Sequence, residues 1–330
     1  MLHYLLTGED MNFGWGMLAF LIACLFCFFA TFILNKKLMD KLPRDLGRAF
    51  AVNGELSKGK ARGAGIIFVT VFALSTLLFV SCDMETVIYM VVVMLAMLSG
   101  FFDDAAKTPW GEYKKGIIDF VIAIATALTF VHYNTTHIYI RIIGEVYELP
   151  KVAYVILAVI LIWVSINVIN CTDGVDGLCG SIAVVSLLLF AQYATVDESD
   201  SFMILSFVFA LGAYLWFNAK SSVMLMGDAG SRAIGLFMAI VAMKSGSPLL
   251  FVPFCLVFIL DGGLGLVKII FIRFLKLKNF LKNTKCPLHD HARKVAGWSD
   301  EQTVLRFVII QLLLGYAYMM LVITIVSLTH

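Results

Sequence analysis

The chain has 330 residues, of which 61% are hydrophobic and 15% are charged, and its formal net charge is +2. Soluble domains contain about half apolar and about a quarter charged residues, so this composition excludes an ordinary soluble protein and indicates a membrane protein. The net charge is small and no basic run is interleaved with aromatic residues, which argues against a nucleic-acid partner.

Long apolar runs recur along the whole sequence. A membrane-spanning helix needs about 20 apolar residues, and only helices or closed barrels satisfy their backbone hydrogen bonds in lipid. The runs are of helical length and no linker could hold a second domain, so we predict a single all-α integral membrane domain over residues 1–330. Ten membrane-spanning helices are expected, near residues 15–34, 65–82, 86–102, 116–132, 151–169, 178–194, 202–217, 232–244, 248–272 and 304–328.

Basic residues gather in alternate loops. The first, third and ninth loops are rich in lysine and arginine, whereas the segments 81–86 and 195–200 in the other loops are acidic. Because basic loops tend to stay in the cytoplasm, we expect the odd-numbered loops on the cytoplasmic side and both termini outside. Residues 137–150 alternate apolar and polar around Gly144 and are expected to form a short outer β-hairpin.

Four groups of polar residues interrupt the apolar sequence, and all of them fall in odd-numbered loops. They are Asp103 with Asp104; Asn167, Asn170, Asp173 and Asp176; Asn218 with Asp228; and His289 with His291. These groups are therefore expected on one face of the membrane. A transporter would place its carboxylates nearer the centre of the bilayer, so the pattern favours an active site in cytoplasmic loops.

The residue types in these groups suggest phosphoryl chemistry. Several carboxylates on one face would repel each other without a cation, and oxygen ligands favour Mg²⁺ or Mn²⁺ over Zn²⁺. Asp228 lies in a glycine-rich turn at an expected helix start, where free N–H groups suit a phosphate. His289 and His291 lie among basic residues and are expected to donate to a diphosphate. Taken alone, the Asp228 turn would also suit an ordinary helix start, and Asp103-Asp104 a solvated helix end.

Two further charges lie inside the ninth expected span. Asp261 and Lys268 are seven residues apart, and charged side chains in a membrane are costly and usually functional. The spacing allows both to lie on one helix face. Two interpretations are open: Asp261 and Lys268 form a structural ion pair, or they line a groove for the substrate.

In this order, the polar blocks resemble the polyprenyl-phosphate N-acetylhexosamine-1-phosphate transferase superfamily over about residues 53–310. The most specific block is NVINCTDGVDGL at 167–178. Within the superfamily the chain looks most like the phospho-N-acetylmuramoyl-pentapeptide transferase family. The supporting segments are LWFN at 215–218 before MGD at 226–228, and PLH at 287–289 with GW at 297–298.

The resemblance implies a function in peptidoglycan biosynthesis, and hence in the cell wall, cell shape and cell division. It implies Mg²⁺-dependent transfer of phospho-MurNAc-pentapeptide from UDP-MurNAc-pentapeptide to undecaprenyl phosphate, giving lipid I and UMP. It also implies a bacterial cytoplasmic membrane location, an active site facing the cytoplasm and, by analogy, a homodimer. Two alternatives are a UDP-GlcNAc-dependent GlcNAc-1-phosphate transferase of the same superfamily and a nucleotide-sugar transporter.

The resemblance also implies roles for particular residues. Asp228 and Asn170 would bind Mg²⁺, and Asp103 and Asp104 would orient or deprotonate the lipid phosphate. Lys115 would help to hold phosphate. His289 and His291 would reach the diphosphate as part of the catalytic site. The remaining expected substrate-binding residues are Asn167, Asn170, Asp173, Asp176, Gly177, Asn218 and Lys60.

The chain departs from the family pattern at four places. Asp290 interrupts the run of three histidines that is usual in the family, and Ala292 follows the remaining pair. The segment 60–65 reads KARGAG, where the family usually has Thr-Pro-x-x-Gly-Gly. Asp119 replaces the usual Gln four residues after the motif lysine, and Leu225 stands where an aromatic residue often stacks on uracil.

Overall fold

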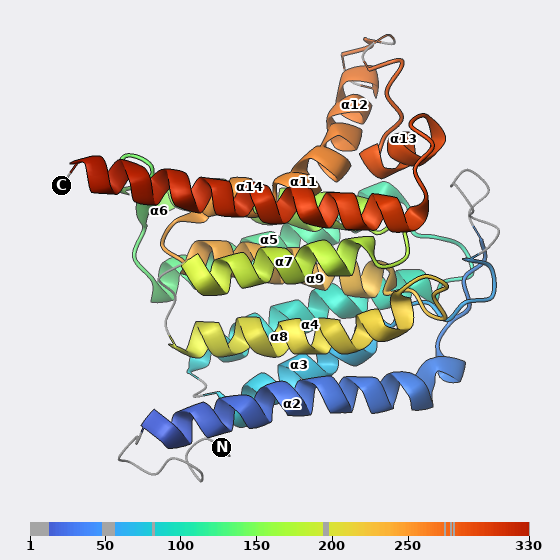
Figure 1. The fold of residues 1–330 in the computed structure, drawn as a ribbon, viewed down its shortest axis with the longest axis horizontal. Coiled ribbons are helices and arrows are strands. Elements are labelled where there is room, and N and C mark those ends of the chain that lie inside the picture. The colour runs from blue at the N-terminus through green and yellow to red at the C-terminus, as the bar shows by residue number, and fades with distance from the viewer. Residues whose placement is uncertain are drawn as a thin grey trace.

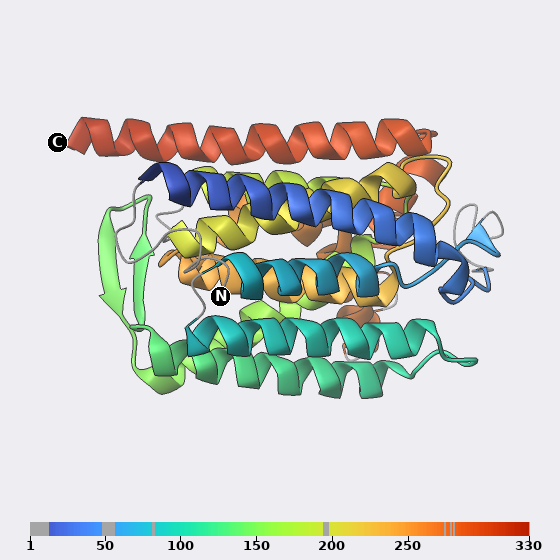
Figure 2. The same cartoon turned by 90° about the horizontal axis from the view of Figure 1, so that it is seen from below.

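The protein is a bundle of long helices with one small β-sheet at its end (Figures 1 and 2). The computed structural model describes residues 13–47, 57–80, 83–193, 198–273, 275–277, 279 and 281–329. Parts of both acidic loops expected above lie outside the described residues. The helices are α2 (Phe13–Leu38), α3 (Gly65–Phe79), α4 (Met84–Asp104), α5 (Glu112–Tyr133), α6 (Lys151–Thr172), α7 (Leu178–Tyr193), α8 (Glu198–Asn218), α9 (Gly227–Lys244), α10 (Phe251–Phe254), α11 (Leu256–Phe258), α12 (Leu264–Arg273), α13 (Leu288–Lys294) and α14 (Asp300–Thr329).

Each expected span coincides with a helix or, for residues 248–272, with a broken helical run. Among the described residues, six helices are long and apolar enough to cross a membrane, or seven if the bent run is counted as one span. Helices α3 and α7 are apolar but shorter, and α9 carries three charged residues. The protein is therefore mostly helical and crosses the membrane several times, whereas the total of ten spans remains a prediction.

Helix α9 lies at the centre of the bundle. All its residues from Gly227 to Met243 are buried, and it packs against α3, α4, α6, α7 and α8. Glycines allow these helices to approach closely: a Cβ atom on Gly235 would lie 2.6 Å from the Cα atom of Ile166 on α6. Small residues at such contacts are typical of helices that pack in membranes. The position of the start of α9 is therefore fixed by its neighbours.

Adding a methyl group at Gly100 is expected to destabilise the bundle. The new Cβ atom would lie 2.3 Å from the backbone carbonyl of Asp228, so α4 and the start of α9 would have to separate. We expect Gly100→Ala to lower the free energy of unfolding by about 1–3 kcal/mol, measured as a lower thermal midpoint in detergent. Gly212→Ala in α8 is the matched control, because nothing lies within 4 Å of that position. Equal losses in the two variants would contradict the packing argument.

Helix boundaries follow local sequence signals. Asp83 caps α4, because its carboxylate accepts a hydrogen bond from the backbone N–H of Thr86 at 2.7 Å. The turn between α6 and α7 ends at Gly177, whose φ of +83° is a conformation that glycine adopts without strain. This turn carries part of the polar block at 167–178.

The expected hairpin is present. Strand β1 (His137–Ile140) pairs antiparallel with β2 (Glu145–Glu148), with His137 opposite Glu148. The hairpin lies at the same end of the bundle as the start of α2 and the end of α14 (Figure 2). The loops that carry the predicted site residues lie at the opposite end of the bundle. The orientation of either end in the membrane remains a prediction.

The ninth expected span is broken and changes direction. Its two parts, Pro248–Phe254 and Leu256–Arg273, are bent by 72°. A π-helical turn, η4 (Ile259–Gly263), lies just before α12 and contains Asp261. Helix α12 and the short α13 consequently project from the side of the bundle at the site end (Figure 1). Such π-helical turns are frequent at functional sites.

Candidate active site

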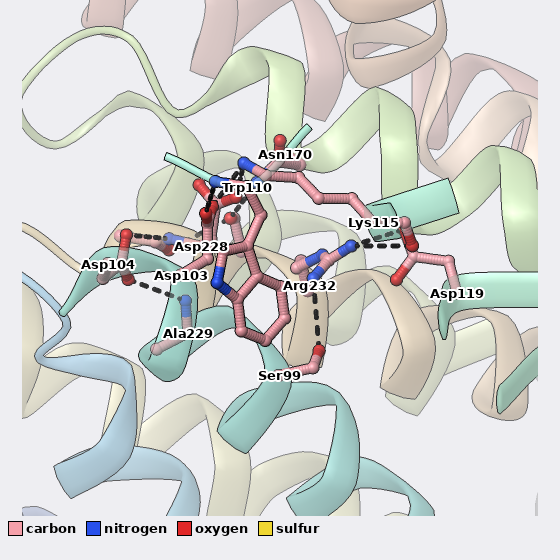
Figure 3. Close-up of polar contacts among 12 residues, drawn as sticks. Ser99, Asp103, Asp104, Trp110, Lys115, Asp119, Asn170, Asp228, Ala229 and Arg232 are labelled. Atoms are coloured by element: carbon pink, nitrogen blue, oxygen red, sulfur yellow. Dashed lines mark hydrogen bonds and ion pairs between the residues drawn. The ribbon is translucent and has the colours of Figure 1, made fainter. Parts of the chain in front are cut away.

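Three carboxylates and two cations form the centre of the site. Asp103 and Asp104 end α4, Asp228 lies in the first turn of α9, and Lys115 lies in the first turn of α5. The Nζ atom of Lys115 contacts the Asp103 carboxylate and is 2.9 Å from Asp228 Oδ2 (Figure 3). On the other side, Arg62 donates from Nε to Asp104 Oδ1 at 2.7 Å and has Nη2 3.7 Å from Asp228 Oδ1. The fold thus brings together the predicted residues of three separate helices.

Asp104 acts as a cap for α9. Its carboxylate accepts hydrogen bonds from the backbone N–H groups of Asp228 at 3.2 Å and Ala229 at 3.1 Å (Figure 3). These N–H groups lie in the first turn and have no partner within the helix, and a negative charge there is favourable. A Cβ atom on Gly227 would lie 2.2 Å from Asp104 Oδ2, so glycine is needed for this approach. The side chain of Asp104 is 0% exposed, so it is not a solvated helix end.

Asp103 fixes the loop that leads into α5. Its Oδ1 accepts a hydrogen bond from the backbone N–H of Trp110 at 2.7 Å, while Oδ2 contacts Lys115. The ammonium group of Lys114 lies 3.3 Å from the centre of the Trp110 ring. Asp103 therefore holds the loop and the first turn of α5 beside the carboxylates.

Asp228 is an anion at neutral pH. Burial by itself would raise the pKa of its carboxyl group, but the positive charges of Lys115, Arg62 and Arg232 outweigh burial and lower the pKa to about 2. Its two oxygens contact different cations, Lys115 and Arg62. Asp228 can therefore offer a permanent negative charge to a metal ion.

The residues expected to hold Mg²⁺ fit that ion. The amide nitrogen of Asn170 donates to the Ser231 hydroxyl at 2.8 Å, and that hydroxyl donates to the Gly227 carbonyl at 3.0 Å. The amide oxygen of Asn170 thus remains for another partner. Among the residues that the structure describes, no group of three or more His, Cys, Asp or Glu side chains is arranged to hold a metal. Mg²⁺ is commonly bound by only one or two carboxylates together with water and substrate phosphates, so the Asp228 carboxylate and the Asn170 amide oxygen are compatible with this ion.

A second group connects the α6–α7 turn to the segment before α9. Lys60 Nζ lies 3.0 Å from Asp176 Oδ2, and these side chains are 21% and 22% exposed. The Gly177 N–H donates to Asn218 Oδ1 at 2.9 Å, and Asn218 Nδ2 donates to the Met224 carbonyl at 2.8 Å. Asn218 is buried and shapes the backbone, whereas Lys60 and Asp176 are accessible to a ligand.

The segment 60–62 links this second group to the carboxylates. Ala61 is buried and forms bridges to Arg44 and Met224, so the chain is extended here. Alternate side chains of an extended chain point to the same side. Lys60 therefore reaches Asp176 while Arg62 reaches Asp104. Sequence reasoning missed Arg62. The available signal was the pair of cations Lys60 and Arg62, two residues apart in the segment 60–65.

Two further residues of the 167–178 block lie at the end of α6. Asn167 is half-buried and donates to the Trp163 carbonyl one turn earlier at 2.8 Å. Asp173 is also half-buried and forms the C-cap of α6. Their contact with a nucleotide remains a prediction.

His289 is held by Asp261. Its Nδ1 lies 2.8 Å from Asp261 Oδ2, and its backbone N–H donates to Asp261 Oδ1 at 2.7 Å. Both side chains are buried. A proton on Nδ1 is fixed by this contact, which leaves Nε2 for a ligand. A Cβ atom on Gly174 would lie 2.4 Å from Nε2, so the ring lies against the α6–α7 turn, as expected for a site residue.

The structure decides against a pair between Asp261 and Lys268. Lys268 instead donates to the Thr284 carbonyl at 2.7 Å. Asp261 lies in the π-helical turn, which alters the helical spacing that would have placed Asp261 and Lys268 on one face. Its side chain contacts α13 instead. Sequence analysis therefore identified Asp261 as unusual without identifying His289 as its partner.

The other residues of α13 form a local network. His291 is half-buried and its Nδ1 accepts a hydrogen bond from the Lys285 N–H at 3.2 Å. Asp290, which interrupts the histidine run, binds Arg293 at 3.1 Å and Lys294 at 3.1 Å. These contacts stabilise α13, and contact of His291 with a diphosphate remains a prediction.

Asp119 is paired with an arginine that sequence reasoning did not single out. Arg232 Nη2 lies 2.7 Å from Asp119 Oδ2, and both side chains are buried (Figure 3). Arg232 also donates to Ser99 Oγ at 3.2 Å and to the Lys115 carbonyl at 3.3 Å. The available signal was a charge one turn after Asp228 in an otherwise apolar helix.

Comparison with known proteins identifies the class to which this site belongs. Residues 86–246 match the model for glycosyl transferase family 4. A phospho-N-acetylmuramoyl-pentapeptide-transferase of Treponema pallidum is 36% identical, covering 87% of this chain and 85% of the relative. Proteins of the same name from Aquifex aeolicus and Dictyoglomus thermophilum are 31% and 27% identical, covering 93% and 89% of this chain and 95% of each relative.

The fold and these matches define a multi-pass membrane enzyme of the glycosyl transferase class. Within that class, the chain belongs to the phospho-N-acetylmuramoyl-pentapeptide transferase family. The resemblance drawn from the sequence motifs is thereby confirmed. The transporter alternative is wrong, because the relatives are transferases.

Proposed function

We propose that the protein transfers phospho-MurNAc-pentapeptide from UDP-MurNAc-pentapeptide to undecaprenyl phosphate in a Mg²⁺-dependent reaction that yields lipid I and UMP. The cluster of Asp103, Asp104, Asp228, Lys115 and Arg62 carries this proposal, in a chain of this family. Anionic and cationic groups concentrated around one point suit the neutralisation and positioning on which phosphoryl transfer depends.

The proposed reaction is one displacement at the β-phosphorus, the phosphorus atom bonded to the sugar. An oxygen of undecaprenyl phosphate forms the new P–O bond, and the bond from this phosphorus to the bridging oxygen breaks. UMP leaves with that oxygen. The attacking phosphate is already ionised near neutral pH, so no residue needs to remove a proton from it.

The residues of the site then have separate tasks. Asp228 and Asn170 would hold Mg²⁺, which neutralises diphosphate charge when it is bound. Lys115, whose side chain is 27% exposed, presents its ammonium group to phosphate oxygens. Asp103 places Lys115, and Asp104 places the start of α9. The lipid phosphate would therefore be oriented by Asp103 and Asp104 indirectly, through the groups that they hold.

Lys60, Asp176 and the His289 ring lie around the α6–α7 turn and are proposed to bind the nucleotide diphosphate. Lys60 can exchange Asp176 for a phosphate or a base oxygen, since both side chains are partly exposed. His289 Nε2 can donate to a diphosphate oxygen when the ring is protonated. Asp261 keeps the ring in the required orientation.

Replacing Asp261 with asparagine is expected to lower kcat for UMP release by about 10- to 100-fold, as loss of a partner that orients a site histidine often does. The amide carries no negative charge and would present an N–H group to Nδ1, so it would disfavour the doubly protonated ring that places a positive charge beside the diphosphate. Steady-state kinetics with a thermal midpoint measurement would separate this effect from misfolding. Asp300→Asn is the control, because Asp300 pairs with Arg293 of α13 and not with His289. A similar fall in kcat in both variants would contradict the role of Asp261.

We further propose that the protein resides in the bacterial cytoplasmic membrane as a homodimer, with the site end in the cytoplasm and both termini outside. Lys36 and Lys37 lie in the last turn of α2, at the site end of the bundle, which supports this orientation by the usual distribution of basic residues. The dimer is proposed by analogy with the family.

The test is UMP release by purified protein in detergent, with undecaprenyl phosphate, Mg²⁺ and either UDP-MurNAc-pentapeptide or UDP-GlcNAc. UMP release with UDP-MurNAc-pentapeptide, if it stops when Mg²⁺ is chelated, would establish the proposal. Release with UDP-GlcNAc alone would keep the reaction class and make the protein a GlcNAc-1-phosphate transferase. Absence of release with either donor would overturn the proposed function.

A further inference from the structure

Two ion pairs are stacked between α5 and α9. Asp119 follows Lys115 by four residues on α5, and Arg232 follows Asp228 by four residues on α9. Residues four apart lie on the same helix face, and both helices run away from the site end. The Asp119–Arg232 pair therefore lies one turn below the Lys115–Asp228 pair (Figure 3). The signs alternate, so each charge of the upper pair has an opposite charge below it on its own helix.

The lower pair is deeply buried and joins three helices. Both side chains are 3% exposed. Arg232 uses its guanidinium group to reach Asp119 on α5, Ser99 on α4 and the backbone carbonyl of Lys115. The planar, forked guanidinium group suits several fixed acceptors at once.

Stability alone does not account for this pair. Removing two charges from water costs several kcal/mol per ion. Replacing a buried ion pair with well-packed apolar residues often leaves a protein equally stable. Asp119 Oδ1 is buried and has no hydrogen-bond partner among the described residues, which adds to the cost. A pair that is costly and lies beside the active site is more readily explained by what it positions.

Apart from Arg232, the start of α5 is held by the Asp103–Trp110 hydrogen bond in the loop before it and by an exposed ion pair between Glu112 and Arg273. Residues 111–114 are exposed, Lys115 is half-buried, and Asp119 is the first buried residue of the helix. The lysine side chain is long and flexible, so the position of its ammonium group depends on where its backbone is held. Arg232 holds that backbone directly, through the Lys115 carbonyl.

We propose that Asp119 and Arg232 are positioning residues that hold the backbone of Lys115 and the start of α5, so that the ammonium group stays between Asp103 and Asp228. They need not touch the substrate. The presence of an aspartate at position 119, where the family usually has Gln, is thus explained by its partner Arg232. The expected effect on catalysis rests on the proposed function, whereas the placement of Lys115 can be tested without it.

The first test measures the reactivity of Lys115 in the double variant Asp119→Leu/Arg232→Met. Replacing both partners leaves no unpaired buried charge, so the thermal midpoint should stay near that of the wild type. Modification of Lys115 by an amine-acylating reagent, followed by mass spectrometry, should become several-fold faster. Lys60 is the internal control, because its contact with Asp176 is separate. Unchanged protection of Lys115 in the folded variant would overturn the proposal.

Arg232→Lys provides a second variant if the double variant does not fold. It keeps the charge opposite Asp119, but a lysine lacks the forked geometry that reaches Ser99 and the Lys115 carbonyl as well. Faster acylation of Lys115 in this folded variant is the expected result. Acylation at the wild-type rate would count against a positioning role.

The second test is kinetic. We expect the double variant to lower kcat for UMP release by about tenfold or more while KM for the donor changes less than about threefold, because a small displacement of a catalytic group chiefly affects the transition state. The matched control is Glu85→Gln/Lys244→Met, which removes the partly buried pair at the far end of α9. Full kcat in the Asp119/Arg232 variant would show that the pair only stabilises the fold. No UMP release by the wild type would overturn the proposed function, while the acylation result would still decide the placement of Lys115.

Discussion

Replacing Asp228 with asparagine is expected to lower UMP release by about a thousandfold or more, since a metal-binding carboxylate supplies several kcal/mol of transition-state stabilisation. Among the residues that the structure describes, Asp228 is the one carboxylate that contacts both Lys115 and Arg62. The neighbouring positive charges lower its pKa to about 2, so it is anionic at neutral pH. Asparagine has the same shape but cannot balance these cations or bind Mg²⁺ strongly.

The fold should survive this substitution. Asp104 caps α9 through the backbone N–H groups of residues 228 and 229, not through the Asp228 side chain. The measurement is the rate of UMP release, combined with the thermal midpoint with and without Mg²⁺. Mg²⁺ should raise the midpoint of the wild type and not that of Asp228→Asn, because a ligand stabilises only a state that binds it.

Glu85→Gln is the matched control for Asp228→Asn. Glu85 is also a buried carboxylate, and it pairs with Lys244 at the other end of α9 at 3.2 Å. Its loss should affect stability more than catalysis. A comparable fall in UMP release in both variants, or an active Asp228→Asn enzyme, would refute the central role of Asp228.

Lys115→Met is expected to have the second-largest effect, a fall in kcat of about a hundredfold or more, in line with the removal of one preorganised charge from a site of phosphoryl transfer. The ammonium group lies between Asp103 and Asp228, both buried. Methionine keeps the length and most of the packing but leaves two carboxylates without their shared cation. The phosphate of the substrate would also meet a more negative site.

Lys114→Met provides the neighbouring control. Lys114 is exposed and its ammonium group lies over the Trp110 ring, 3.3 Å from the ring centre, whereas Lys115 pairs with Asp103 and Asp228. UMP release should stay close to the wild-type rate in this variant. Lys115→Arg should recover part of the lost rate, because it restores the charge with a different shape. Equal rates in Lys114→Met and Lys115→Met would rule out a specific role for Lys115.

The sequence by itself determined the class of fold and much of the candidate site. A chain this apolar must satisfy its backbone within helices when it is in lipid, so the helical segments could be placed from composition and length alone. The polar blocks identified the family, and alternation of the loops placed Asp103, Asp228 and His289 at one end of the bundle. Lys115 followed from the family motif.

Only the tertiary structure decided which charges pair with each other. Asp119 and Arg232 are 113 residues apart, and Lys60 and Asp176 are 116 residues apart. Local patterns set the backbone conformation of each segment, but such contacts depend on how closely the helices approach and at what rotation. That packing determines the position of Arg62, the capping role of Asp104 and the pairing of Asp261 with His289. Glycines on α4 and α9 allow the helices to pack closely.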